Sequence, residues 1–128
     1  MIHEEVTLAG KPVNLGYCYA TEIVYKDLSD ENITDIIQDT VTGINATPSR
    51  MPDAKRSIHL VLAAIIAYYE SIKKEAPIKD SELMNETSPV ELGKALGTII
   101  NLWAKFHNIP NGEPEEKPQK GKGKKTKN

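Results

Sequence analysis

From residue 5 the chain reads Glu5-Val-Thr-Leu-Ala-Gly-Lys-Pro-Val-Asn-Leu-Gly-Tyr-Cys-Tyr-Ala-Thr-Glu-Ile-Val-Tyr-Lys-Asp-Leu28, and its hydrophobic period changes from two residues to that of a helix. Valines and leucines alternate with other residues on both sides of Gly10 and Lys11, which is typical of two strands joined by a turn. The pattern predicts a β-hairpin over residues 3–16. It also predicts a helix over residues 19–28 directly after the hairpin.

Four more helices are predicted from apolar spacing and from capping residues. They span residues 32–42, 53–75, 80–86 and 89–107. The sequence therefore predicts an α+β fold that is mainly α, with the N-terminal hairpin packed on a bundle of four to five helices. We expect one globular domain over residues 1–110, because a chain of this size suits a single hydrophobic core.

Capping residues fix where several of these helices begin. Asn32 and Asp53 are placed as N-caps, and Ser88 with Glu91 three residues later forms a capping box with Pro89 at the first helical position. In the helix over residues 19–28, the side expected to be buried carries three residues at four-residue steps, Ala20, Val24 and Leu28. Gly43 is placed to end the helix over residues 32–42.

Two helices have unusual surfaces. The helix over residues 53–75 is apolar nearly all round between His59 and Tyr69, so we expect it to be buried on several sides, at the centre of the bundle or partly against another chain. In the helix over residues 89–107, Gly93 and Gly97 lie one turn apart. We interpret this pair as a place where a neighbouring helix approaches closely, the alternative being two glycines that only weaken the helix.

The end of the chain differs in composition from the rest. The 128 residues carry a formal charge of −2, but residues 111–128 carry six lysines and three glutamates, so the tail has +3 and the remainder −5. The tail contains no apolar side chain and is predicted to be disordered. We favour a solubilising role for the tail, because it has no aromatic residue to stack on bases. The alternative is a salt-dependent contact of its lysines with nucleic acid. The candidate electrostatic residues are Lys120, Lys122, Lys124, Lys125 and Lys127.

No catalytic or cofactor-binding constellation is recognisable in the sequence. The three histidines are scattered, no Cys or His pair has the spacing of metal ligands, and no phosphate-binding loop is present. We interpret Cys18 as a buried thiol and His59 as a core or interface residue. The sequence predicts a protein that is not an enzyme and that binds no metal or cofactor.

Large apolar residues on the two longest helices are the candidates for contact with a partner, because aromatic and large aliphatic side chains dominate interface energetics. The candidate partner-binding residues are Tyr68, Tyr69, Leu96, Ile100, Trp103 and Phe106. The longest apolar run has ten residues, against about 20 for a membrane span. We therefore expect no membrane contact, and a cytoplasmic protein with a reduced thiol.

Residues 5–28, with the order Val-Thr-Leu-x-Gly-Lys-x-Val-x-Leu-Gly-Tyr-x-Tyr-Ala-Thr-Glu-Ile, resemble the start of tail assembly chaperones of tailed bacteriophages. The helical order extends this resemblance to about residue 108. It implies a small non-enzymatic protein that coats the long tape measure protein during tail assembly and is displaced when tail tube subunits polymerise. It also implies action in the cytoplasm of a bacterial host. We further expect self-association, because many copies linked along one client bind far better than each copy alone.

Two other functions remain open from the sequence. One is a structural virion component, such as a minor tail protein or tail-terminator protein. The other is a small nucleic-acid-associated protein that acts through its basic tail, a partner class that the acidic body makes less favoured.

Overall fold

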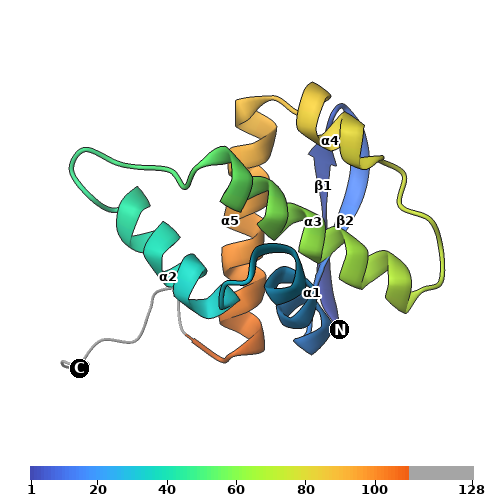
Figure 1. Ribbon diagram of the computed structural model, residues 1–128, viewed down its shortest axis with the longest axis horizontal. Coiled ribbons are helices and arrows are strands. Elements are labelled where there is room, and N and C mark those ends of the chain that lie inside the picture. The colour runs from blue at the N-terminus through green and yellow to red at the C-terminus, as the bar shows by residue number, and fades with distance from the viewer. Residues whose placement is uncertain (110–128) are drawn as a thin grey trace.

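The computed structural model describes residues 1–109 and confirms the α+β, mainly α fold, with an N-terminal hairpin followed by five helices (Figure 1). The elements are β1 (Ile2–Leu8), β2 (Lys11–Tyr17), α1 (Tyr19–Ser29), α2 (Ile33–Ile44), α3 (Ala54–Ser71), α4 (Asp80–Glu86) and α5 (Pro89–Phe106). The tail predicted to be disordered, including Lys120, Lys122, Lys124, Lys125 and Lys127, lies outside the described residues.

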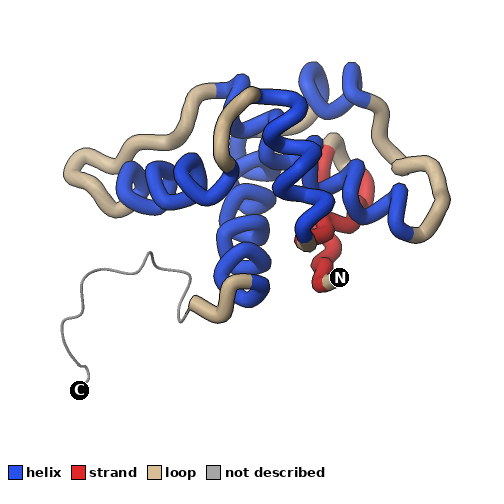
Figure 2. Tube along the Cα trace, turned by 60° about the horizontal axis from the view of Figure 1, so that its bottom comes forward, coloured by secondary structure: helices blue, strands red, loops and turns tan. Residues whose placement is uncertain are grey.

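The two long helices hold the hairpin between them. α5 packs against both strands and α3 packs against β2, and the two helices also contact each other. In Figures 1 and 2, α3 crosses α5, and α2 lies at the side of the molecule away from the hairpin. The core that these elements enclose is built from Leu8, Val13, Leu15, Tyr17, Tyr25, Ile33, Ile36, Ile37, Val41, Leu60, Val61, Ala63, Ala64, Ile65, Ile78, Leu83, Ala95, Leu96, Ile99, Leu102, Trp103 and Ala104.

The hairpin turn lies one residue earlier than the sequence suggested. Leu8 pairs with Lys11, so the loop consists of Ala9 and Gly10, and both have positive φ, 52° and 75°. Two successive residues with positive φ are what a type I′ turn requires, and this turn matches the twist of the strands it joins. Glycine adopts this conformation without strain, whereas alanine does not.

Glu91 ties this turn to the start of α5. Its carboxylate accepts the Ser88 N–H at 2.9 Å, which completes the capping box, and it also accepts the N–H groups of Ala9 and Gly10 at 3.1 and 3.0 Å. These backbone donors, Ser88 first, hold the pKa of the Glu91 carboxyl below its usual value of 4.5. One carboxylate therefore fixes the hairpin relative to the last helix.

The predicted N-caps are confirmed. The side chains of Asn32, Asp53 and Ser88 accept the backbone N–H groups of Asp35, Arg56 and Glu91. Each bond satisfies one of the donors that a helix leaves free at its N-terminus.

The predicted buried side of α1 is wrong. Ala20 and Leu28 are exposed and Val24 is half-buried, whereas Thr21 and Tyr25 are buried. These two residues can be buried because their hydroxyl groups are hydrogen-bonded: Thr21 Oγ1 donates to the Gly16 carbonyl at 3.0 Å, and Tyr25 Oη lies 3.1 Å from Glu31. Burial raises the pKa of Tyr25 to about 12.

Two helix ends also differ from the prediction. α2 continues through Gly43 to Ile44, and Gly43 is needed for another reason, because a Cβ there would lie 2.9 Å from the Arg50 carbonyl oxygen. α3 ends at Ser71 rather than at residue 75. Directly after this end, Lys73 adopts a positive φ of 57° and the Lys74 N–H donates to the Tyr69 carbonyl. This left-handed turn is a common way to end a helix.

Gly93 and Gly97 do not receive a neighbouring helix within residues 1–109. A Cβ added at either position would meet nothing within 4 Å. The close packing expected of this pair is therefore absent from the described part of the chain, and this face of α5 is open.

Ala9→Asn is expected to raise the free energy of unfolding by about 1 kcal/mol, because asparagine adopts the left-handed conformation more readily than alanine and Asn-Gly is the favoured type I′ pair. Chemical denaturation followed by circular dichroism measures the change. Ala9→Val is the control and should lower the stability, because a β-branched residue is disfavoured at positive φ. Equal stability of the three proteins would contradict the assignment of strain to Ala9.

Candidate partner-binding site

α3 contributes an apolar face that the core does not fully cover. Leu60, Val61 and Ile65 are buried, but Leu62 and Ile66 on the adjoining face are only half-buried. The prediction that this helix is buried on several sides is thus met over most of its surface. The partly open face is the starting point for a binding site.

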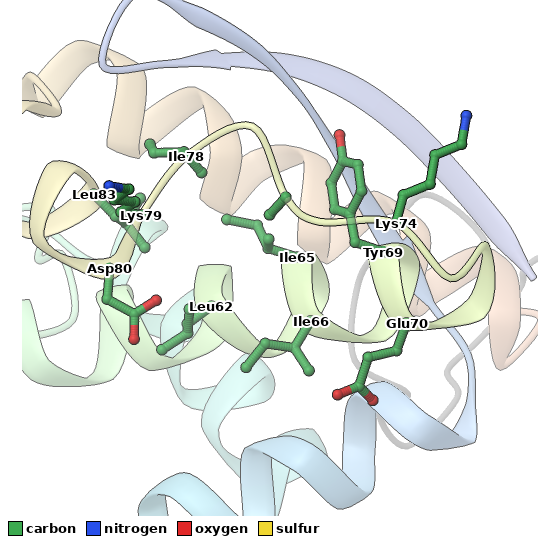
Figure 3. Close-up of a pocket in the computed structure, with 11 residues that line it drawn as sticks. Leu62, Ile65, Ile66, Tyr69, Glu70, Lys74, Ile78, Lys79, Asp80 and Leu83 are labelled. Atoms are coloured by element: carbon green, nitrogen blue, oxygen red, sulfur yellow. The ribbon is translucent and has the colours of Figure 1, made fainter.

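A cleft opens over this face of α3, between the helix and the segment that leads into α4 (Figure 3). Leu62, Ile65 and Ile66 lie along α3, and Ile78 and Leu83 close the other side. The cleft has a volume of about 170 Å³. It is lined by Leu62, Ile65, Ile66, Tyr69, Glu70, Lys74, Ala76, Ile78, Lys79, Asp80 and Leu83, and we call it the α3–α4 cleft.

Charged residues surround the apolar part of the cleft. Glu70 and Lys74 follow its floor at the end of α3, and Lys79 and Asp80 stand at the start of α4. All four are exposed. An apolar floor with a rim of both charges is typical of a site that takes an apolar side chain and pairs with polar groups around it.

An ion pair holds the α4 wall of the cleft against the hairpin. Lys11 Nζ lies 2.6 Å from Glu82 Oε2 and also donates to the Pro77 carbonyl at 3.4 Å. Glu82 Oε1 accepts the Lys79 N–H at 2.9 Å, which caps the start of α4. The hydrogen bond from Lys11, followed by that from Lys79, lowers the pKa of the Glu82 carboxyl from 4.5.

The two predicted tyrosines on α3 are half-buried and both contact the hairpin. Tyr69 lines the cleft, and its hydroxyl accepts the Asn14 N–H at 3.0 Å. The Tyr68 ring lies against the His3 ring, with centroids 4.9 Å apart and planes inclined by 49°, and a Cβ on Gly16 would lie only 3.0 Å from the Tyr68 Cβ. Only Tyr69 of this pair therefore belongs to the cleft.

The predicted partner residues on α5 fall into two groups. Leu96 and Trp103 are buried in the core, and Trp103 Nε1 donates to Thr34 Oγ1 at 3.2 Å. These two residues are corrected from partner-binding to core positions, because the hairpin and the other helices cover the stripe on which they lie. Ile100 and Phe106 are half-buried and pack against the edge of the core.

A second apolar surface, which the sequence did not indicate, lies where α1 meets the end of α5. Tyr19 and Ile23 are 70% and 61% exposed, and the Tyr19 ring stands edge-on to the Phe106 ring at 5.0 Å. We call Tyr19, Ile23 and Phe106 the α1–α5 patch. Tyr19 and Ile23 are one turn apart, and this spacing could have indicated the patch had the buried side of α1 been assigned correctly.

The other residues considered for chemistry are dispersed. Cys18 is half-buried rather than buried, and it precedes α1 as its N-cap. His59 Nδ1 is buried and has no hydrogen-bond partner within residues 1–109, whereas His107 Nε2 lies 2.7 Å from Glu22 Oε2. In the part of the chain that the structure describes, no three His, Cys, Asp or Glu residues are grouped as metal ligands, and no helix is long and apolar enough to cross a membrane.

Comparison of the chain with protein-family models, with curated proteins and with solved structures gives no match. The features of this chain that bear on its function are therefore the α3–α4 cleft, the α1–α5 patch and the sequence resemblance of residues 5–28.

Glu82→Gln is expected to loosen α4, because the variant loses the charge that Lys11 pairs with. The Leu83 amide should lose protection from hydrogen exchange at pH 7, while Leu92 in α5 should keep its protection. Because the folded pKa of Glu82 is below 4.5, its contribution is complete above that pH and is lost as the pH falls through the folded pKa. The difference between the native protein and the variant should then vanish in acid.

The matched control for this experiment is Glu86→Gln. Glu86 lies on the same helix and makes no ion pair within residues 1–109. Its substitution should leave the protection of Leu83 unchanged at both pH values. Equal loss of protection in the two variants would show that the Lys11 pair does not hold α4.

Proposed function

We propose that this protein is a non-enzymatic tail assembly chaperone of a phage or prophage, which holds the tape measure protein during tail morphogenesis in the cytoplasm of the bacterial host. The observation that carries the proposal is the α3–α4 cleft, an apolar site with a charged rim on the surface of a small helical domain. The resemblance of residues 5–28 to this family supplies the identity of the client.

The size of the cleft suits one anchoring side chain of a helical client. Its volume of about 170 Å³ is close to that of an engineered cavity of ~150 Å³ that accepts benzene. A leucine or phenylalanine from an amphipathic helix would therefore fill it. Helices dock in this way by placing an apolar stripe in a groove, with polar contacts at the rim.

The α1–α5 patch provides a second contact of the same kind. Tyr19 and Ile23 are exposed although they are large and apolar, and such residues on a surface commonly mark a binding site when they are grouped. A client with apolar stripes along its length could use the cleft and the patch together. Self-association of the chaperone would add to this, because linked copies bind one long client far more tightly than separate copies do.

The lining of the cleft favours binding over catalysis. The residues around it include no histidine, cysteine or serine that could act as a nucleophile or as its base. Its polar groups are instead two lysines, two carboxylates and the Tyr69 hydroxyl, which already accepts a backbone N–H. These groups are suited to orienting a bound segment.

Ile66→Glu is expected to reduce capture of the tape measure protein by about tenfold, because a carboxylate on the floor of the cleft removes the apolar contact. The measurement is co-purification of the tagged chaperone with the tape measure protein encoded near it, expressed in the same cells. Met84→Glu is the matched control, since Met84 is 60% exposed on α4 and does not line the cleft. It should leave capture unchanged.

Two outcomes would contradict the proposal. If genes for tail tube and tape measure proteins do not flank this one, the assignment to tail assembly fails. If mass spectrometry finds the protein in mature particles, it is a structural component, such as a minor tail or tail-terminator protein, because a chaperone is displaced before the particle is complete.

A further inference from the structure

Each strand of the hairpin has one edge that pairs with the other strand and one outer edge that does not. The register of the hairpin defines which backbone N–H and C=O groups point to the outer edges. Leu8 and Lys11 flank a two-residue loop, so they form a hydrogen-bonded pair, and such pairs recur at every second position. The backbone groups of residues 3, 5 and 7 on β1, and of residues 12, 14 and 16 on β2, therefore point away from the partner strand.

The outer edge of β2 is closed by the protein itself. Pro12 has no N–H to offer, the Asn14 N–H is bonded to Tyr69 Oη at 3.0 Å, and the Gly16 carbonyl accepts from Thr21 Oγ1 at 3.0 Å. α3 and the start of α1 thus cover this edge. No further strand can be added here.

The outer edge of β1 is open. His3, Glu5 and Thr7 make no hydrogen bond through their backbone groups along this edge within residues 1–109, and all three are exposed. A groove of about 440 Å³ runs beside the edge, lined by Glu5, Val6 and Thr7 from β1 and by Val90, Glu91, Lys94 and Thr98 from α5. An unpaired strand edge of this kind is a template for another strand.

We propose that β1 pairs antiparallel with β1 of a second copy of this chain, so that two hairpins form one four-stranded sheet around a two-fold axis. This inference rests on the self-association included in the proposed function, but not on the identity of the client. The same strand edge presented by both copies is the self-complementary surface that a two-fold interface requires.

Charges disfavour two registers of this pairing. Registers centred on Glu4 or Glu5 place two like carboxylates directly opposite, which is unfavourable. Centring the pair on Val6 places the Val6 residues of the two copies opposite each other and puts Glu4 of the second copy opposite Leu8. Glu4 is on the same face of β1 as Leu8, and this face packs on α5. Glu4 of the second copy would therefore lie at the groove that Lys94 lines.

Glu4 and Lys94 are both exposed, and neither makes an ion pair within residues 1–109. The two-fold axis makes this contact twice, with Lys94 of each copy facing Glu4 of the other. The pairing of Glu4 with Lys94, which within residues 1–109 is the one basic residue in a groove lining that also holds Glu5 and Glu91, is the reason for assigning the groove to a second copy and not to an unrelated segment.

The open face of α5 fits the same arrangement. α5 packs on β1, and a two-fold axis normal to the joined sheet would keep the two α5 helices on the same face of that sheet, one on either side of the axis. Val90 is 66% exposed and Gly97 has open space around it, and both lie on the outer side of α5 with Lys94. The missing side chain at Gly97 leaves room for a neighbouring helix.

Thr7→Pro tests the strand pairing. The Thr7 N–H points away from β2, and Thr7 is paired with Pro12, so the substitution removes no bond within the hairpin and places on β1 the residue that already closes β2. Light scattering during size-exclusion chromatography should give a dimer for the native protein and half that molar mass for Thr7→Pro, with the same circular dichroism spectrum. Thr7→Val, which keeps the N–H, should remain a dimer.

Charge reversal tests the register. Glu4→Lys and Lys94→Glu should each be monomeric alone, because each creates two like-charged pairs across the two-fold axis. An equimolar mixture of the two variants should form a dimer, because both pairs are then opposite in charge. Adding Thr7→Pro to both variants should abolish this dimer.

Three results would overturn the inference. A native protein that is monomeric at all concentrations excludes the second copy as occupant. A dimer that persists in Thr7→Pro places the interface elsewhere, such as on the α1–α5 patch. Protection of the Glu5 amide that appears only when the tape measure protein is added assigns the edge to the client. Because the dimer is measured on the purified chain, its failure leaves the cleft experiment with Ile66→Glu unaffected.

Discussion

The arrangement of the molecule depends on the carboxylate of Glu91. It joins two structures that each form locally, the type I′ turn at Ala9 and Gly10 and the capping box of α5, through three backbone N–H groups separated by about eighty positions in the chain. Hydrogen bonds to an ionised carboxylate are stronger than those between neutral groups. This contact fixes how β1 lies along α5, and it thereby fixes the groove between Val6 and Lys94.

The packing of α3 explains why the two edges of the hairpin differ. α3 lies against β2, where Gly16 gives Tyr68 room and Tyr69 bonds the Asn14 N–H. The same helix leaves Leu62 and Ile66 facing the segment before α4, where the cleft forms. A single helix therefore closes one strand edge and creates the α3–α4 cleft, while β1, which it does not cover, keeps its free backbone groups.

The sequence predicts the structure where the signal is local, and it does not where tertiary packing decides. The caps at Asn32, Asp53 and Ser88 depend on residues three positions apart, and they were predicted correctly. The buried side of α1 is not predicted correctly. Thr21 and Tyr25 can be buried because their hydroxyl groups are hydrogen-bonded to Gly16 and Glu31, and the sequence does not show these bonds. Of the partner-binding residues that the sequence predicts, Tyr69 lines the cleft. The sequence does not predict the α1–α5 patch or the burial of Trp103, because both depend on which helices meet.

No residue is shared among the α3–α4 cleft, the α1–α5 patch and the outer edge of β1 with its groove. A copy joined to its neighbour through β1 would therefore keep both apolar sites free for a client. Each dimer would present two clefts related by a two-fold axis. Once a client occupies one cleft, its neighbouring segments are at a high local concentration for the second cleft. A chaperone built in this way could hold a long helical client through many weak anchors and still be displaced one contact at a time.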